Sequence, residues 1–103
     1  MKLEQTILRN LIYNEDYLRK VLPFLKSEYF TDRTEKSIYH EITAFVESYN
    51  NPPTVEAIGL AIQERRNLTD EEVEKSKTYL KEIENTPREG SEIQWLVDKT
   101  EKF

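Results

Sequence analysis

The amino-acid sequence predicts an all-α fold, a compact bundle of about six helices that forms a single domain over residues 1–103. Only two glycines and four prolines occur in 103 residues, so few positions interrupt helices. Between them, apolar residues recur at intervals of three and four, the spacing that places side chains on one helix face. A composition of 37% hydrophobic and 34% charged residues is that of an ordinary soluble domain with a small core.

The first helix is expected over residues 3–13, LEQTILRNLIY, whose apolar residues spread over one half of the cylinder. A second helix is expected from Glu15, with Asn14 as its N-cap. Its inward residues are predicted to be Tyr17, Leu18, Val21 and Leu22. Pro23 lacks an N–H and clashes with the preceding turn, so the helix should stop or kink there. Residues 24–30 are predicted to form a short connector with room for one helical turn.

The third helix is expected after Asp32, which together with Glu35 has the spacing of a capping box, although Asp replaces the usual Ser or Thr. At about 100° per residue, its apolar side chains fall within an arc of about 120°. They are Ile38, Tyr39, Ile42, Phe45, Val46 and Tyr49. Such a broad face predicts that this helix lies at the centre of the bundle.

Residues 50–53, Asn-Asn-Pro-Pro, should end that helix, and Thr54 is the predicted N-cap of a fourth. Gly59 within the fourth helix is expected to allow a close approach by another helix. The fifth helix should begin after Thr69, which forms a second capping box with Glu72. The acidic run DEEVE is therefore interpreted as favourable charge at a helix start rather than as a metal site.

A loop is expected at residues 86–91, and Ser91 should begin a sixth helix that reaches the end of the sequence. Its inward face is formed by Ile93, Leu96, Val97, Thr100 and Phe103. Trp95 lies about 100° or more from the middle of that face. No Gly, Asn or Pro ends this helix, so the 103 residues are expected to be a fragment ending within it.

These faces together define a predicted hydrophobic core, drawn from every predicted helix and from the connector. Its members are Ile7, Leu11, Val21, Phe30, Ile38, Ile42, Phe45, Ile58, Ile62, Leu80 and Leu96.

The charge distribution opposes a surface that grips phosphates. Net charge is −5; residues 1–50 carry 7 basic and 8 acidic groups, and residues 51–103 carry 8 and 12. A nucleic-acid-binding domain would instead show a basic stripe. Short basic pairs such as Arg19 and Lys20 are interpreted as solvated helix faces.

No catalytic, cofactor or metal site is predicted in the chain. The phosphate-binding patterns G-x-x-x-x-G-K-S/T and G-x-G-x-x-G are absent, and two isolated glycines cannot form them. His40 is the sole histidine and should point away from the apolar face of its helix into solvent. The chain has no cysteine, which fits a reducing cytoplasm, and no apolar run of membrane-spanning length. The residues alone thus predict a helical module that binds a partner.

Four motifs in order resemble the N-terminal domain of DnaB-type hexameric replicative DNA helicases. They are EQTIL at residues 4–8 with Leu11 and Ile12, the connector residue Phe30, the Ile38–Tyr39 pair, and Pro52 to Thr54 with the helix VEAIGLAIQ. The resemblance covers essentially the whole chain. Each motif alone has low specificity, and the four with the family's spacing are more specific.

Departures from the bacterial pattern point to one branch of this family. Arg9 and Asn10 stand where bacterial members usually have glycines, and Glu35 and Ser37 replace histidines that are common before the Ile-aromatic pair. Two further stretches look like the replicative helicases of T-even-type phages, namely SEYF at residues 27–30 and WLVDKTEKF at residues 95–103.

The resemblance implies the N-terminal assembly and primase-interaction domain of a phage replicative 5′ to 3′ DNA helicase, a primosome component in the host cytoplasm. The implied parent is a ring-shaped hexamer whose RecA-like motor domain uses ATP and magnesium and binds single-stranded DNA. That motor domain is absent from these residues, so the fragment itself is expected to be no enzyme, to need no cofactor and to contact no membrane. Its implied partners are other subunits and the primase.

Trp95 and Phe103 are the candidate oligomer or partner contacts. In the family that the sequence resembles, the last helix continues into a hairpin through which N-terminal domains pair. Aromatic groups on and beyond the inward face of that helix would then meet the hairpin or a neighbouring subunit; packing on this domain's own helices is the other interpretation.

Other interpretations of the sequence stay open. The main alternative is a stand-alone helical adaptor, or a mimic of a helicase domain, that binds a replication protein. A small hydrolase would need a nucleophile, a base and an orienting group, and no such set is recognisable. An acidic DNA mimic is opposed by the mixture of both charge signs along the predicted helices.

Overall fold

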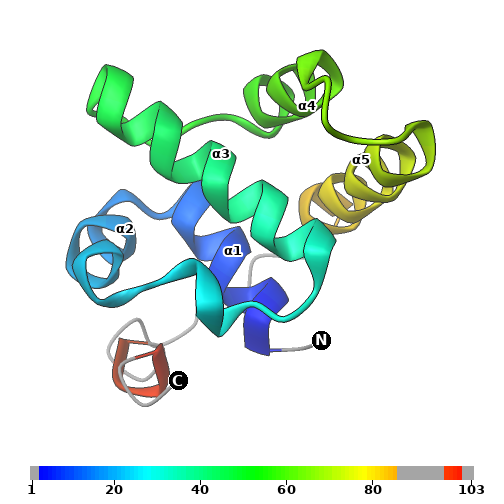
Figure 1. The fold of residues 1–103 in the computed structure, drawn as a ribbon. Coiled ribbons are helices and arrows are strands. Elements are labelled where there is room, and N and C mark those ends of the chain that lie inside the picture. The colour runs from blue at the N-terminus through cyan, green and yellow to red at the C-terminus, as the bar shows by residue number, and fades with distance from the viewer. Residues whose placement is uncertain (1–2, 86–96, 101–103) are drawn as a thin grey trace.

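Helix α3 (Arg33–Tyr49) is the element around which the others are arranged (Figure 1). The computed structural model describes residues 3–85 and 97–100. In it, α1 (Leu3–Tyr13) packs on α2 (Glu15–Val21) and on α3, while α4 (Val55–Glu64) and α5 (Asp70–Asn85) pack on each other and on α3. Residues 97–100 are also helical, and no strand occurs in the described part of the chain. The all-α fold predicted from the sequence is therefore confirmed.

The first two helices begin and end at the predicted residues. The Asn14 side chain accepts a 3.1 Å hydrogen bond from the Tyr17 amide, which fixes the start of α2. The α-helix ends at Val21, and the 3₁₀ turn η1 (Leu22–Phe24) follows, with Pro23 in its first turn. A second 3₁₀ turn, η2 (Ser27–Tyr29), lies in the predicted connector.

Capping residues also fix the later helices. Asp32 begins α3 by accepting a 2.7 Å hydrogen bond from the Thr34 amide, and Asn50 ends it in the left-handed conformation, with φ of 55°. The Thr54 hydroxyl accepts a 3.0 Å bond from the Ala57 amide at the start of α4. Glu35, predicted as the second half of a capping box, is buried, and its carboxylate accepts a hydrogen bond from Tyr79 of α5. The spacing in the sequence does not predict that long-range contact.

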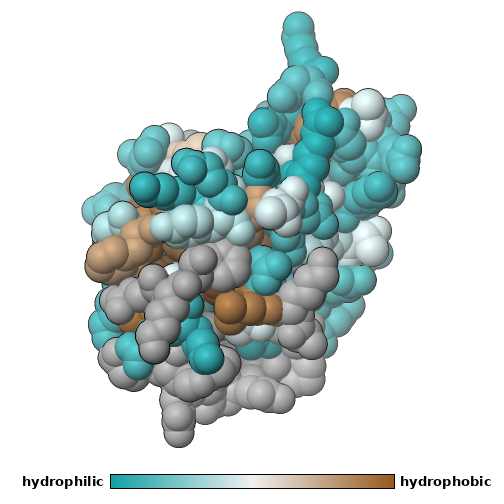
Figure 2. Space-filling model, turned by 60° about the horizontal axis from the view of Figure 1, so that its bottom comes forward, coloured by the Kyte–Doolittle hydropathy of each residue, from teal (hydrophilic) through white to brown (hydrophobic). Residues whose placement is uncertain are grey.

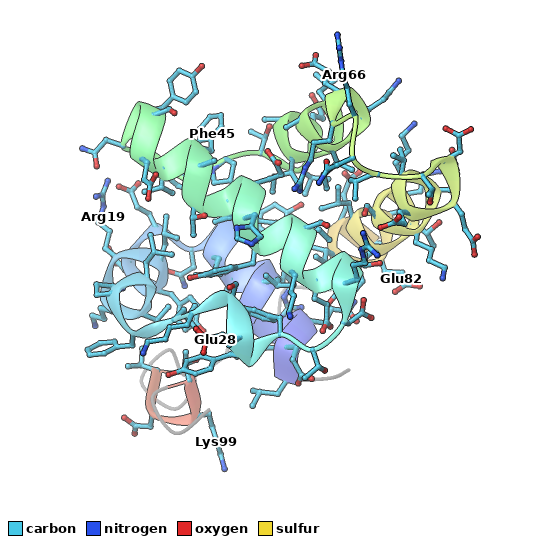
Figure 3. All side chains as sticks on the ribbon, viewed as in Figure 1. Arg19, Glu28, Phe45, Arg66, Glu82 and Lys99 are labelled. Carbon is cyan, nitrogen blue, oxygen red and sulfur yellow. The ribbon has the colours of Figure 1, made fainter. Side chains whose placement is uncertain are left out.

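One hydrophobic core runs through the bundle. Among the predicted core residues, those that are buried are Ile7, Leu11, Val21, Phe30, Ile38, Ile42, Ile58, Ile62 and Leu80. Phe45 is only partly buried, contrary to the prediction. The last turns of α3 extend past α1, so Phe45 lies beside α4 with one side open (Figures 1 and 3). Leu96 lies outside the described residues.

Gly59 does not mark a close helix approach, contrary to the sequence-based expectation. A Cβ atom placed on Gly59 would lie 3.8 Å from Leu80 Cδ1, which is an ordinary van der Waals distance. The packing of α4 on α5 therefore leaves room for a side chain at this position.

Candidate interaction site

Within residues 3–85 and 97–100, no group of three or more histidine or acidic side chains is placed to hold a metal ion. His40 is exposed, as the sequence predicts. None of the helices described is long and apolar enough to cross a membrane.

A groove runs between the second half of α3 and the exposed face of α4. Side chains at intervals of three and four residues form each wall, as expected where two helices diverge around a space. The α3–α4 groove is lined on one wall by Glu41, Ala44, Phe45, Ser48 and Tyr49, and on the other by Ala57, Ile58, Leu60, Ala61 and Glu64. Its volume is about 380 Å³, and it is open to solvent along one side.

Hydrophobic side chains in this groove are unusually exposed. Tyr49 is 65% exposed and Leu60 is 61% exposed. In the described part of the chain one other large hydrophobic residue is exposed: Phe24, which lies outside the groove and is 51% exposed. The rings of Phe45 and Tyr49, one helical turn apart, contact each other at a tilt of 44°, with centroids separated by 4.7 Å. In Figure 3, Phe45 lies on the side of α3 that faces α4. Folding alone does not require such exposure, and it is typical of surfaces that a partner covers.

Figure 2 shows one face of the molecule, on which hydrophilic side chains predominate and hydrophobic ones occupy small separate areas. A second, smaller apolar hollow lies between α2 and the end of α3, lined by Leu18, Leu22 and Val46. The Arg19 guanidinium crosses there, donating 2.7 Å and 3.2 Å hydrogen bonds to Glu15 and to the Asn50 carbonyl. The bond to Asn50 ties α2 to the end of α3.

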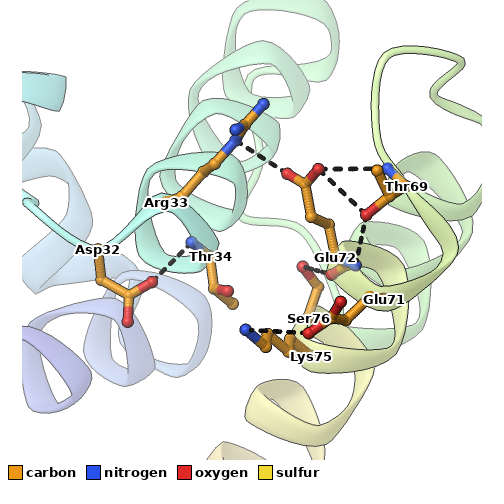
Figure 4. A network of polar contacts seen from close by, with 8 residues as sticks. All are labelled: Asp32, Arg33, Thr34, Thr69, Glu71, Glu72, Lys75 and Ser76. Carbon is orange, nitrogen blue, oxygen red and sulfur yellow. Dashed lines mark hydrogen bonds and ion pairs between the residues drawn. The ribbon is translucent and has the colours of Figure 1, made fainter.

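The starts of α3 and α5 meet in a polar junction (Figure 4). Thr69 and Glu72 form the predicted capping box: the Glu72 amide donates to the Thr69 hydroxyl at 3.1 Å, and the Thr69 amide donates to the Glu72 carboxylate at 3.3 Å. The other carboxylate oxygen of Glu72 lies 2.8 Å from Arg33 Nε. Lys75 lies 3.6 Å from Glu71. These charges pair with one another, so we interpret the junction as structural.

Three tyrosine hydroxyls join distant segments. Tyr39 donates to the Leu25 carbonyl at 2.9 Å, and Tyr79 donates to Glu35 at 2.8 Å. Tyr17 and Thr100 share a 2.6 Å hydrogen bond that attaches residues 97–100 to α2. Burial raises the pKa of Tyr17 to about 12 and raises the pKa of Tyr39. These hydroxyls therefore stay protonated at neutral pH and serve as structural ties.

The residues that the sequence singled out as contacts lie beyond what the structure describes. Trp95 and Phe103 are both outside the described ranges. Of the inward face predicted for the same helix, Val97 and Thr100 are described, and both are buried.

Sequence reasoning missed Leu60 and did not determine whether Tyr49 is exposed. One signal was present for Leu60, because it lies opposite Ile58 and Ile62 on the helical wheel, away from the core-facing stripe of α4. A large apolar residue in that position has no core to enter. The exposure of Tyr49 depends on where α4 lies, which the sequence pattern does not specify.

The described part of the chain is all-α and carries an exposed apolar groove. The family model for the DnaB-like helicase N terminal domain matches residues 1–97. This chain therefore belongs to the DnaB-like helicase N-terminal domain family, and the resemblance seen in its sequence is confirmed.

A curated relative carries the same family name. The DnaB-like replicative helicase of Enterobacteria phage T4 is 32% identical over 99 residues, which make up 96% of this chain and 20% of that protein. The chain thus spans about one fifth of the length of the curated relative that it matches. No solved structure matches it significantly.

Proposed function

We propose that these residues form the N-terminal collar domain of a phage replicative helicase, where they support assembly of the ring and present a surface to the primase. The observation that carries the proposal is the family match over residues 1–97. The similarity to a replicative helicase of phage T4 supports a phage origin. Such a protein would work in the cytoplasm of the bacterial host.

The charge and the motif content of the chain support a role in assembly rather than in binding nucleotide or DNA. The chain has a net charge of −5 and contains no G-x-x-x-x-G-K-S/T sequence, so neither a phosphate-gripping surface nor a nucleotide loop is encoded in it. In the proposal, ATP, magnesium and single-stranded DNA bind a motor domain outside these 103 residues. The collar contributes contacts between subunits and with the primase.

Sequencing the source gene beyond the Phe103 codon is the first test. We expect the reading frame to continue through a helical hairpin to a G-x-x-x-x-G-K-S/T loop. A stop codon at that point would overturn the collar assignment, and a stand-alone adaptor or helicase-domain mimic would then be the better interpretation. Purified residues 1–103 are expected to hydrolyse no ATP.

Deletion of the domain from the full protein is the functional test. Removing residues 1–103 should impair ring formation in light scattering and abolish the response to primase. Nucleotide hydrolysis by the remaining motor domain should persist, at least in part. An unchanged ring and an unchanged primase response would contradict the proposal.

A further inference from the structure

We propose that the α3–α4 groove binds a basic amphipathic helix of a partner protein. The inference rests on the surface of this chain alone and goes beyond the proposed function. It would hold equally for a collar domain and for a stand-alone adaptor.

The geometry of the groove fits a helix. The lining residues of α3 lie at positions 41, 44, 45, 48 and 49, and those of α4 at 57, 58, 60, 61 and 64. Both sets repeat at three- and four-residue intervals, so each wall presents a ridge along its helix axis. A third helix laid between two such ridges is the common way to fill a space of this shape.

The apolar content of the groove provides anchors. Tyr49 and Leu60, on opposite walls, are 65% and 61% exposed, and each retains most of its surface for a partner. Ala44, Ala57 and Ala61 lie on the same walls and are small enough to let a helix backbone approach closely. Large exposed side chains beside small ones make pockets for the apolar residues of an incoming helix.

The charge around the groove selects a basic partner. Glu41 and Glu64 line the groove, and no lysine or arginine is among its lining residues. Arg65 lies 3.5 Å from Glu41 and partly balances it, whereas Glu64 is exposed. Glu47 and Glu56 are also exposed on α3 and α4, although they do not line the groove. Lysine or arginine flanking an apolar stripe would complement these carboxylates.

A second copy of the chain fits the groove less well. In a two-fold dimer the same patch meets itself, so Glu41 and Glu64 of one copy would face the same carboxylates of the other. Juxtaposed like charges oppose such an association. The charge argument thus favours a different protein over self-association at this surface.

A matched pair of peptides tests the inference on the 103-residue chain. The probe is a fluorescein-labelled amphipathic helix with a leucine stripe flanked by lysines, and its control carries glutamate at every lysine position. We expect saturable binding of the lysine peptide by fluorescence anisotropy, with amide NMR shifts concentrated at Ala44, Ala57 and Ala61. The glutamate peptide should bind at least about tenfold more weakly.

Point variants locate the binding surface. Leu60→Gln should weaken binding of the lysine peptide about tenfold or more, and Glu64→Gln should weaken binding and reduce its salt dependence. Phe24→Gln is the matched control, because Phe24 is 51% exposed but does not line the groove. It should leave binding unchanged. Because Leu60 is mostly exposed, Leu60→Gln should leave the fold intact. The unfolding midpoints of the variants will show whether a loss of binding reflects a loss of folding.

Several results would overturn the inference. Absence of binding, equal binding of both peptides, NMR shifts away from the groove, or equal effects of Leu60→Gln and Phe24→Gln would each do so. A dimer in sedimentation that Leu60→Gln dissociates would assign the groove to a second copy instead. None of these results bears on whether the native reading frame continues, so the proposed function is tested separately.

Discussion

The hydroxyl of Tyr79 donates a 2.8 Å hydrogen bond to the carboxylate of Glu35, which joins α5 to the first turn of α3. Glu35 is 1% exposed, so its carboxylate has lost nearly all of its contact with water. Burial, and then the carboxylate of Glu35, raise the pKa of Tyr79 well above its usual value, and the charges of Asp32 and Glu4 add to the effect. The hydrogen bond from Tyr79 therefore gives a buried carboxylate a partner where α3 packs on α5.

Replacing Tyr79 by phenylalanine should destabilise the domain. Tyr79→Phe keeps the ring but removes one donor from a buried carboxylate, and a loss of about 1–3 kcal/mol in the free energy of unfolding is expected. Urea unfolding followed by circular dichroism measures it. Tyr49→Phe is the control, because Tyr49 is 65% exposed, and a change within about 0.5 kcal/mol is expected there. Equal stability of the two variants would argue against a role for the Glu35 contact.

Alkaline pH should weaken the fold through the buried tyrosines. The pKa of Tyr17 is raised from 10.0 to about 12, chiefly by burial, although its bond to Thr100 partly lowers it. Above pH 10 the unfolded chain releases this proton before the folded chain does, so stability falls as pH rises from about 10 to about 12. The slope is at most about 1.4 kcal/mol per pH unit for one such group.

Comparison with Tyr17→Phe isolates that contribution. The variant lacks the titrating hydroxyl, so its stability should fall less steeply over this pH range than that of the unaltered chain. Denaturant unfolding at a series of pH values provides the two curves, and tyrosinate absorbance should show one high-pKa transition fewer in the variant. Parallel curves would mean that Tyr17 has an ordinary pKa in the folded state.

The capping box at the start of α5 should contribute measurably to stability. Thr69→Ala removes the oxygen that accepts from the Glu72 amide at 3.1 Å, and a loss of about 1 kcal/mol is expected. Thr78→Ala provides a matched control, because Thr78 is exposed within the same helix and alanine is the better helix former. Thermal unfolding should therefore show a lower midpoint for Thr69→Ala and an unchanged or higher one for Thr78→Ala.

Local patterns predicted most of this fold because they act within a few residues. Asn14, Thr54 and Thr69 each cap a helix through an amide three positions along the chain, and such short contacts are visible in the sequence. The predicted apolar stripes likewise face the core wherever a neighbouring helix covers them. The helix bounds and most of the buried residues follow from these two kinds of signal.

Contacts between distant segments could not be predicted in the same way. Glu35 and Tyr79 are 44 positions apart, and Tyr17 and Thr100 are 83 apart, so no spacing rule relates them. The partial burial of Phe45 has the same origin, because it depends on where α4 lies beside α3. The groove therefore emerges only from the arrangement of helices, although the outward position of Leu60 was visible beforehand.

Gly59→Ala should stabilise the domain. Gly59 lies inside α4 with an ordinary negative φ, and the added methyl group would meet Leu80 at 3.8 Å without a clash. Alanine is favoured over glycine in a helix interior by about 1 kcal/mol, so a gain of roughly that size is expected. A lower unfolding midpoint in thermal or urea denaturation would show that α4 and α5 approach more closely than this distance indicates.

Trp95→Ala tests the contact residue predicted from the sequence. Because Trp95 projects away from the inward stripe of its predicted helix, we expect truncation to weaken assembly of the parent ring more than it lowers the thermal stability of the 103-residue chain. An aromatic anchor at an interface typically contributes about 2 kcal/mol or more, which is roughly a thirtyfold change in an association constant. Light scattering of the full protein measures assembly, and thermal unfolding of residues 1–103 measures stability.

Leu80→Ala should show the opposite balance, because Leu80 is 3% exposed and belongs to the core of the domain. Unchanged assembly of the Trp95→Ala protein would remove Trp95 from the contacts between subunits and leave packing within its own domain as its role.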